Sequence, residues 1–153
     1  RGLEMCIRDR GVAYLVGELS SNVATLSYDT ATGTFTVKTI VSTIPDDWTA
    51  HNGAAAIRLS ADGKFVYVSN RGNNSLAVFA SDEAGQLTLV QRISTEGDFP
   101  RDFNWTANQR LVLVVNQNSD NASLFERDAQ SGKLTLVQKD FMVPEGVSVL
   151  PAK

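Results

Sequence analysis

YVSNRGNNSLAVFASDEAGQLTLVQ, at residues 67–91, recurs further along the chain as LVVNQNSDNASLFERDAQSGKLTLVQ at residues 113–138. Both copies end in the same Leu-Thr-Leu-Val-Gln sequence after a turn that contains glycine. A weaker copy, AYLVGELSSNVATLSYDTATGTFTV, occupies residues 13–37. The copies are spaced by about 45 residues, a period typical of the blades of a β-propeller.

Each copy consists of short β-branched and aromatic runs separated by turn signals such as Asp62-Gly63 and Ser131-Gly132. Four such runs per repeat predict an all-β fold, a β-propeller fragment of about three four-stranded antiparallel blades. An ordinary antiparallel meander or sandwich also shows regularly spaced turns, but the near-identical copies favour the propeller. In the clearest blade we expect strands at residues 54–60, 65–70, 75–81 and 87–94.

The repeats also predict the organisation of the chain. We expect blades at about residues 11–44, 51–95 and 97–141, with the first blade beginning at its second strand, and a closing strand at residues 146–150. A propeller closes with about 4 to 8 blades, so three cannot complete a ring. Residues 11–153 are therefore interpreted as the C-terminal part of a propeller whose N-terminal blades are missing.

Residues 1–10 are interpreted as a leader outside the fold. Met5-Cys6-Ile7-Arg8-Asp9-Arg10 resembles the translation of a sequencing-library adapter, which predicts a non-native origin for this segment. A natural disordered leader is the alternative, because chain termini are commonly disordered.

Composition narrows the possible partners. The chain of 153 residues has 14 Lys plus Arg against 17 Asp plus Glu, a net charge of -3, and its basic residues are scattered. This argues against nucleic acid as a partner. No apolar run approaches the ~20 residues that span a bilayer, so no membrane association is expected. The single cysteine, Cys6, excludes an intramolecular disulfide and agrees with a cytoplasmic location.

Three equivalent positions of the repeat carry different chemistry. Glu18, Arg71 and Gln117 each follow the second strand of their blade, and equivalent positions lie at the same end of successive blades. A carboxylate, a guanidinium and an amide together suit a charged, polyhydroxylated ligand. The alternative is that all three are solvated turn residues.

Two further residues are candidates for ligand binding. Arg101 begins the third blade on the loop that returns to the same end, although an ion pair with Asp98 or Asp102 would explain it equally well. His51, the only histidine, lies in the Trp48–Gly53 loop, where a solvated role is more common than a catalytic one. One histidine and scattered acids lack the spacing of metal ligands, and we expect no metal and no cofactor.

The segments 54–71 and 96–103 strongly resemble the lactonase family of seven-bladed β-propellers, which includes 6-phosphogluconolactonases and carboxymuconate cyclases. The resemblance covers about residues 11–150. It implies catalytic roles for Glu18, in Gly17-Glu18-Leu19, and for Arg71, in Ser69-Asn70-Arg71. The histidine and first arginine of the family's proposed catalytic set belong to earlier blades, and His51 does not occupy the histidine's motif.

The resemblance implies that the intact parent is a cytoplasmic lactone hydrolase acting on 6-phosphogluconolactone, a phosphorylated sugar lactone, without a cofactor. A carboxymuconate-type lactone cyclase or isomerase and a non-catalytic interaction scaffold are the alternatives. In the parent, the tail at residues 146–150 is expected to supply the innermost strand of the first blade. This chain by itself is expected to be inactive and to self-associate, because the missing blades would cover its apolar end faces.

Overall fold

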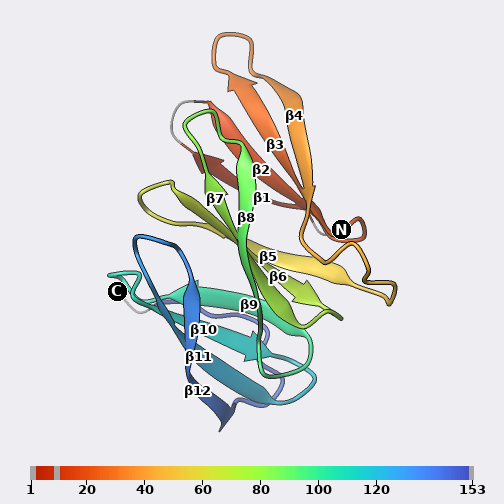
Figure 1. The fold of residues 1–153 in the computed structure, drawn as a ribbon, viewed down its shortest axis with the longest axis vertical. Helices are drawn as coiled ribbons and strands as arrows, with labels where there is room; N and C mark the ends of the chain where they lie inside the picture. Colours follow the sequence, from red (N-terminus) through yellow and green to blue (C-terminus); the bar gives the residue numbers. More distant parts are fainter. Residues whose placement is uncertain (1–2, 9–10, 152–153) are drawn as a thin grey trace.

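The computed structural model describes residues 3–8 and 11–151, which form twelve strands in three antiparallel sheets of four. Figure 1 shows the sheets stacked along the long axis of the molecule in the order of the sequence. The first sheet contains β1 (Leu3–Arg8), β2 (Val12–Gly17), β3 (Asn22–Asp29) and β4 (Thr34–Ser42). The second contains β5 (Gly53–Leu59), β6 (Phe65–Arg71), β7 (Ser75–Ser81) and β8 (Leu87–Ser94), and the third β9 (Pro100–Trp105), β10 (Leu111–Asn116), β11 (Asn121–Arg127) and β12 (Leu134–Met142).

Each sheet is a meander in which every strand pairs with its neighbour in sequence, as expected for propeller blades. The second-sheet strands begin and end within one residue of the positions expected from the sequence. An irregularity in strand pairing is also repeated. In all three sheets the pairing of the third with the fourth strand contains a register shift, at Thr25/Leu26, Val78/Phe79 and Leu124/Phe125. Such bulges increase the local twist of a strand pair.

The core consists of two apolar clusters between the sheets. Tyr14 and Val23 of the first sheet pack with Phe79 of the second, and Tyr67 of the second packs with Phe103 of the third. The middle sheet is covered on both faces, which explains why β6 is buried from Phe65 to Asn70 instead of alternating. Each fully buried large side chain contributes about 1.5–3 kcal/mol to stability.

The first sheet corrects one expectation. The leader was expected to lie outside the fold, leaving the first blade without its first strand, yet β1 pairs with β2 from Leu3↔Gly17 to Arg8↔Val12. Paired strands are joined by hydrogen bonds between backbone groups. An extended segment can therefore pair with the open edge of a strand whatever the origin of its sequence. The adapter origin of residues 1–10 stays a prediction.

The tail corrects a second expectation, because residues 146–150 do not form a strand in this chain. The Val149 amide donates to Oδ2 of Asp102 at 2.9 Å, and Nδ2 of Asn104 donates to the Val149 carbonyl at 3.0 Å. The tail therefore runs over the third sheet and is bound mainly by side chains. Together with Leu111 and Leu124, it lines an apolar cavity of about 270 Å³. A closing strand needs a partner strand, and none of the described strands pairs with this segment.

Candidate functional site

The site begins with a turn that is repeated at one end of all three sheets. After the second strand the backbone enters the left-handed region at Ser21, Asn74 and Asp120, with φ values of 50°, 53° and 52°. Glycine adopts this conformation most easily, and asparagine and aspartate adopt it more easily than the other residues do. Glu18, Arg71 and Gln117 lie in or at the start of these turns, so the repeat places them in equivalent positions, as the sequence predicted.

Buried asparagines join neighbouring blades beneath these turns. Asn70, fully buried, accepts from the Thr43 hydroxyl at 2.7 Å and donates to the Thr43 carbonyl at 3.1 Å. Asn116 repeats the second bond one blade later, to the Thr95 carbonyl, also at 3.1 Å. Sequence reasoning missed these residues, although their equivalent places in the repeat were a usable signal.

Asn52 ties the first two turns together. Its Nδ2 donates to the Ser21 hydroxyl at 2.8 Å, and its Oδ1 accepts from the Asn73 amide at 3.0 Å. Ser21 and Asn73 belong to the turns that follow Glu18 and Arg71. The Asn52 side chain therefore fixes the position of the first blade relative to the second. Asn52 was also missed, and only its place beside His51 in the loop hinted at a role.

Glu18 and Arg71 form an ion pair between the first and second sheets, in which Nη2 of Arg71 donates to Oε1 of Glu18. The guanidinium also donates from Nε to the Gly53 carbonyl at 3.2 Å. The Arg71 side chain is 12% exposed and that of Glu18 28%. Gly53 leaves room for this arrangement, since a Cβ there would lie 3.1 Å from Nη2. The structure thus brings together an acid and a cation, partly buried, at the end of the sheets.

Gln117 and Arg101 form a second contact on the third sheet. Nη1 of Arg101 donates to Oε1 of Gln117 at 3.3 Å, and the arginine is exposed. Asp102 instead pairs with Arg58 at 2.8 Å, and among the described residues Arg101 forms no ion pair with Asp98. The alternative reading of Arg101 as an ion-pair partner of these aspartates is therefore wrong. No direct bond joins Arg101 or Gln117 to Glu18 or Arg71 in the described part of the chain.

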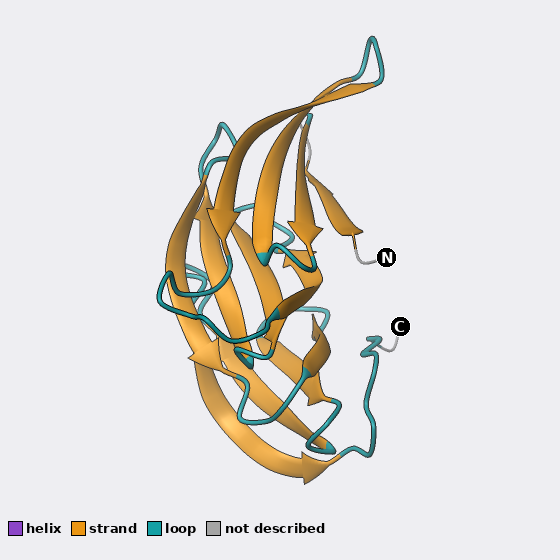
Figure 2. Ribbon diagram, turned by 90° about the vertical axis from the view of Figure 1, so that its right-hand side faces the viewer, coloured by secondary structure: helices purple, strands orange, loops and turns teal. Residues whose placement is uncertain are grey.

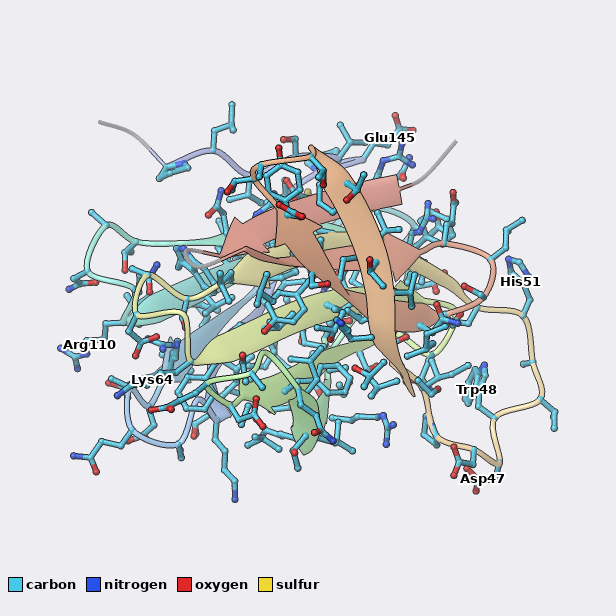
Figure 3. The ribbon with its side chains drawn as sticks, turned by 90° about the horizontal axis from the view of Figure 1, so that it is seen from above. Asp47, Trp48, His51, Lys64, Arg110 and Glu145 are labelled. Atoms are coloured by element: carbon cyan, nitrogen blue, oxygen red, sulfur yellow. The ribbon has the colours of Figure 1, made fainter. Side chains whose placement is uncertain are left out.

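His51 lies apart from the ion pair. Its side chain is exposed on the long loop that also carries the labelled Trp48 and Asp47, and the three side chains stand apart along that loop in Figure 3. Within residues 11–151 the imidazole has no hydrogen bond or ion pair to Glu18 or Arg71. The backbone carbonyl of His51 packs against Gly72, where a Cβ would lie only 2.2 Å from it, so this loop approaches the Arg71 turn through its main chain.

The described residues contain neither a candidate metal centre nor a membrane-spanning helix. They contain no group of three or more histidines, cysteines, aspartates and glutamates that could hold a metal ion. They also contain no helix long and apolar enough to cross a membrane.

Comparison with known proteins gives consistent matches. Residues 6–151 match the family model described as lactonase, 7-bladed beta-propeller. A Bacillus subtilis protein named 6-phosphogluconolactonase is 43% identical over 138 residues, which are 90% of this chain and 40% of that protein. An uncharacterised Lactococcus lactis protein is 48% identical over 92% of this chain and 41% of its own length. The chain thus spans about two fifths of the length of these relatives.

Solved structures agree. A Lactobacillus plantarum protein matches with a TM-score of 0.93 and 62% identity over 95% of this chain and 43% of its own. The periplasmic gluconolactonase PpgL of Pseudomonas aeruginosa matches with a TM-score of 0.87 and 38% identity, over 93% of this chain and 40% of its own.

Proposed function

Because the chain belongs to the seven-bladed β-propeller lactonase family, we propose that Glu18 and Arg71 are part of the site of a lactone hydrolase whose substrate is 6-phosphogluconolactone. The observation that carries the proposal is the ion pair that these two residues form across the first two sheets. The name of the B. subtilis relative supports the choice of substrate.

The chemistry requires a base and a cation. Glu18 accepts a proton from a water molecule, whose oxygen bonds to the lactone carbonyl carbon. Arg71 stabilises the negative charge that develops on the carbonyl oxygen. The bond from the carbonyl carbon to the ring oxygen then breaks, and the proton held by Glu18 passes to that oxygen, which yields the hydroxy acid. Arg101 and Gln117 offer donors for the phosphate and hydroxyl groups of the substrate, and His51 is retained as a binding candidate at the rim.

The test uses a hybrid protein in which this chain replaces the matching C-terminal part of the B. subtilis enzyme. We expect the hybrid to hydrolyse 6-phosphogluconolactone, and Glu18→Gln or Arg71→Ala to lower kcat/KM by about 10²-fold or more. Arg110→Ala and Glu126→Gln are matched controls, because they break an exposed ion pair of 2.9 Å on the third sheet. Unchanged rates in both site variants would refute the assignment. The 153-residue chain alone is expected to be inactive.

The substrate is tested by comparing lactones. A phosphorylated substrate implies a cytoplasmic protein of the pentose phosphate pathway, whereas the P. aeruginosa neighbour is named a periplasmic gluconolactonase. We expect the hybrid to prefer 6-phosphogluconolactone to unphosphorylated gluconolactone. Equal rates with the two gluconolactones would reject the preference for phosphate but leave the lactonase assignment standing. Turnover of muconolactones alone would favour a cyclase or isomerase.

A further inference from the structure

Phe99 has a backbone conformation that a bulky residue rarely adopts. It lies between β8 and β9 with a φ of 65°, in the left-handed region. For a large side chain this is a true outlier, and it persists only where the surroundings impose it. Glycine would adopt this φ without strain, but the sequence Asp98-Phe99-Pro100 places a phenylalanine at this position.

Hydrogen bonds from two sheets impose this conformation. The Phe99 amide donates to Oδ1 of Asn74, in the turn that follows Arg71, at 3.0 Å. The Phe99 carbonyl accepts from the amide of Gln117, the equivalent position of the third sheet, also at 3.0 Å. The backbone of Phe99 thus bridges two of the three turns that carry the candidate site residues.

The aromatic ring of Phe99 lies against the guanidinium of Arg71, with 5.0 Å between the ring centroid and Cζ. A cation over an aromatic face is attracted by the ring quadrupole. Nε and Nη2 of Arg71 are bonded to Gly53 and Glu18, whereas Nη1 has no hydrogen bond within the described residues. The ring therefore covers one face of the guanidinium and leaves the Nη1 edge as the donor available to a ligand.

We propose that Phe99 is a positioning residue, whose strained backbone holds its ring on Arg71 so that the Nη1 edge points at the developing negative charge of the substrate. This inference rests on the proposed function of Arg71. It assigns to Phe99 no contact with the reacting atoms, and it explains why a strained aromatic residue is held in this loop.

The test compares four side chains at position 99 of the active hybrid. Phe99→Leu keeps the bulk but removes the aromatic face, and we expect it to lower kcat roughly tenfold with little change in KM. Phe99→Gly relieves the left-handed strain, so we expect it to fold at least as well as Phe99→Leu and to lose activity equally. Phe99→Tyr and Phe99→Trp keep the ring and should retain most of kcat.

A second measurement reports the contact without any reaction. In the 153-residue chain, the Nε–H proton of Arg71 is expected to shift in the NMR spectrum when Phe99→Leu removes the ring, and to shift little with Phe99→Tyr. An active hybrid in which Phe99→Leu matches the wild-type kcat would overturn the positioning role and leave the lactonase proposal standing. An inactive hybrid with an intact ring-dependent shift would instead reject the lactonase and, with it, the catalytic purpose of Phe99.

Discussion

Single aspartates stabilise the turns between the third and fourth strands. Asp29 accepts from the Ala31 amide at 2.8 Å, and Asp128 accepts from the Ser131 amide and hydroxyl and from the Gln130 amide. These hydrogen bonds favour the carboxylate form, so the pKa of each aspartate lies below its ordinary value of 3.8. The same device thus recurs at the same place in two blades.

The lowered pKa of Asp128 has a defined consequence for stability. A carboxyl whose folded pKa is depressed stabilises the protein above its unfolded pKa and loses that contribution as the pH falls through the folded value. We expect Asp128→Asn to lower the urea midpoint at pH 6, and the difference from the wild type to shrink at pH 3. Asp46→Asn removes the same charge from an exposed loop and should lack this pattern. An equal deficit at both pH values would contradict the assignment.

The hairpin turn between the last two strands of one sheet packs on the sheet before it. The Tyr14 hydroxyl donates to the Gly85 carbonyl at 3.1 Å, and the Tyr67 hydroxyl donates to the Gly132 carbonyl at 2.7 Å. Gly132 has a φ of 73°, and a Cβ there would lie 2.3 Å from a ring carbon of Phe65. Both inter-blade contacts therefore depend on glycine at the tip of the hairpin.

Gly132→Ala should cost about 2–4 kcal/mol, because it adds a steric overlap with Phe65 to the strain of the left-handed backbone. Gly33→Ala is the matched control, since Gly33 has a similar φ of 70° but nothing within 4 Å of the added Cβ. Its expected cost is about 1 kcal/mol from backbone strain alone. Urea unfolding followed by tryptophan fluorescence measures both, and equal losses would show that the inter-blade contact contributes nothing.

At the scale of the whole molecule, the outermost face of the first sheet is apolar and open. Pairing of β3 with β4 places Phe35, Val37 and Ile40 on one face, and their exposed fractions are 47%, 57% and 61%. Figure 2, viewed from the side, shows these two strands extending beyond the second sheet. Large exposed apolar patches on soluble proteins mark sites of association with other molecules.

We expect the 153-residue chain to self-associate through this face. Val37→Lys should shift the sedimentation profile towards monomer by placing a charge at its centre. Leu19→Lys is the control, because Leu19 is 84% exposed but lies in the turn at the end of the sheet. A wild-type chain that remains monomeric at high concentration, or an equal effect of both lysines, would argue against this face.

The residue pattern alone predicted the blades and the end of the sheets at which Glu18 and Arg71 lie. Alternation, turn glycines and the repeat predict strands because each depends on local geometry, and equivalent repeat positions must lie at one end of successive sheets. That reasoning placed Glu18 and Arg71 at the same end of neighbouring blades, and the structure joins them there by an ion pair. It did not identify Asn52 and Asn70, since a buried asparagine and a solvated turn asparagine look alike in a sequence.

The remaining features depend on contacts between distant segments, which a sequence pattern does not encode. β1 pairs because β2 has an open edge, and the tail lies over the third sheet because Asp102 and Asn104 bind it. Phe99 reaches Arg71 only through a strained backbone held by Asn74 and Gln117 from two sheets. Local preference disfavours that conformation, so only the tertiary structure, whose hydrogen bonds offset the strain, could decide it.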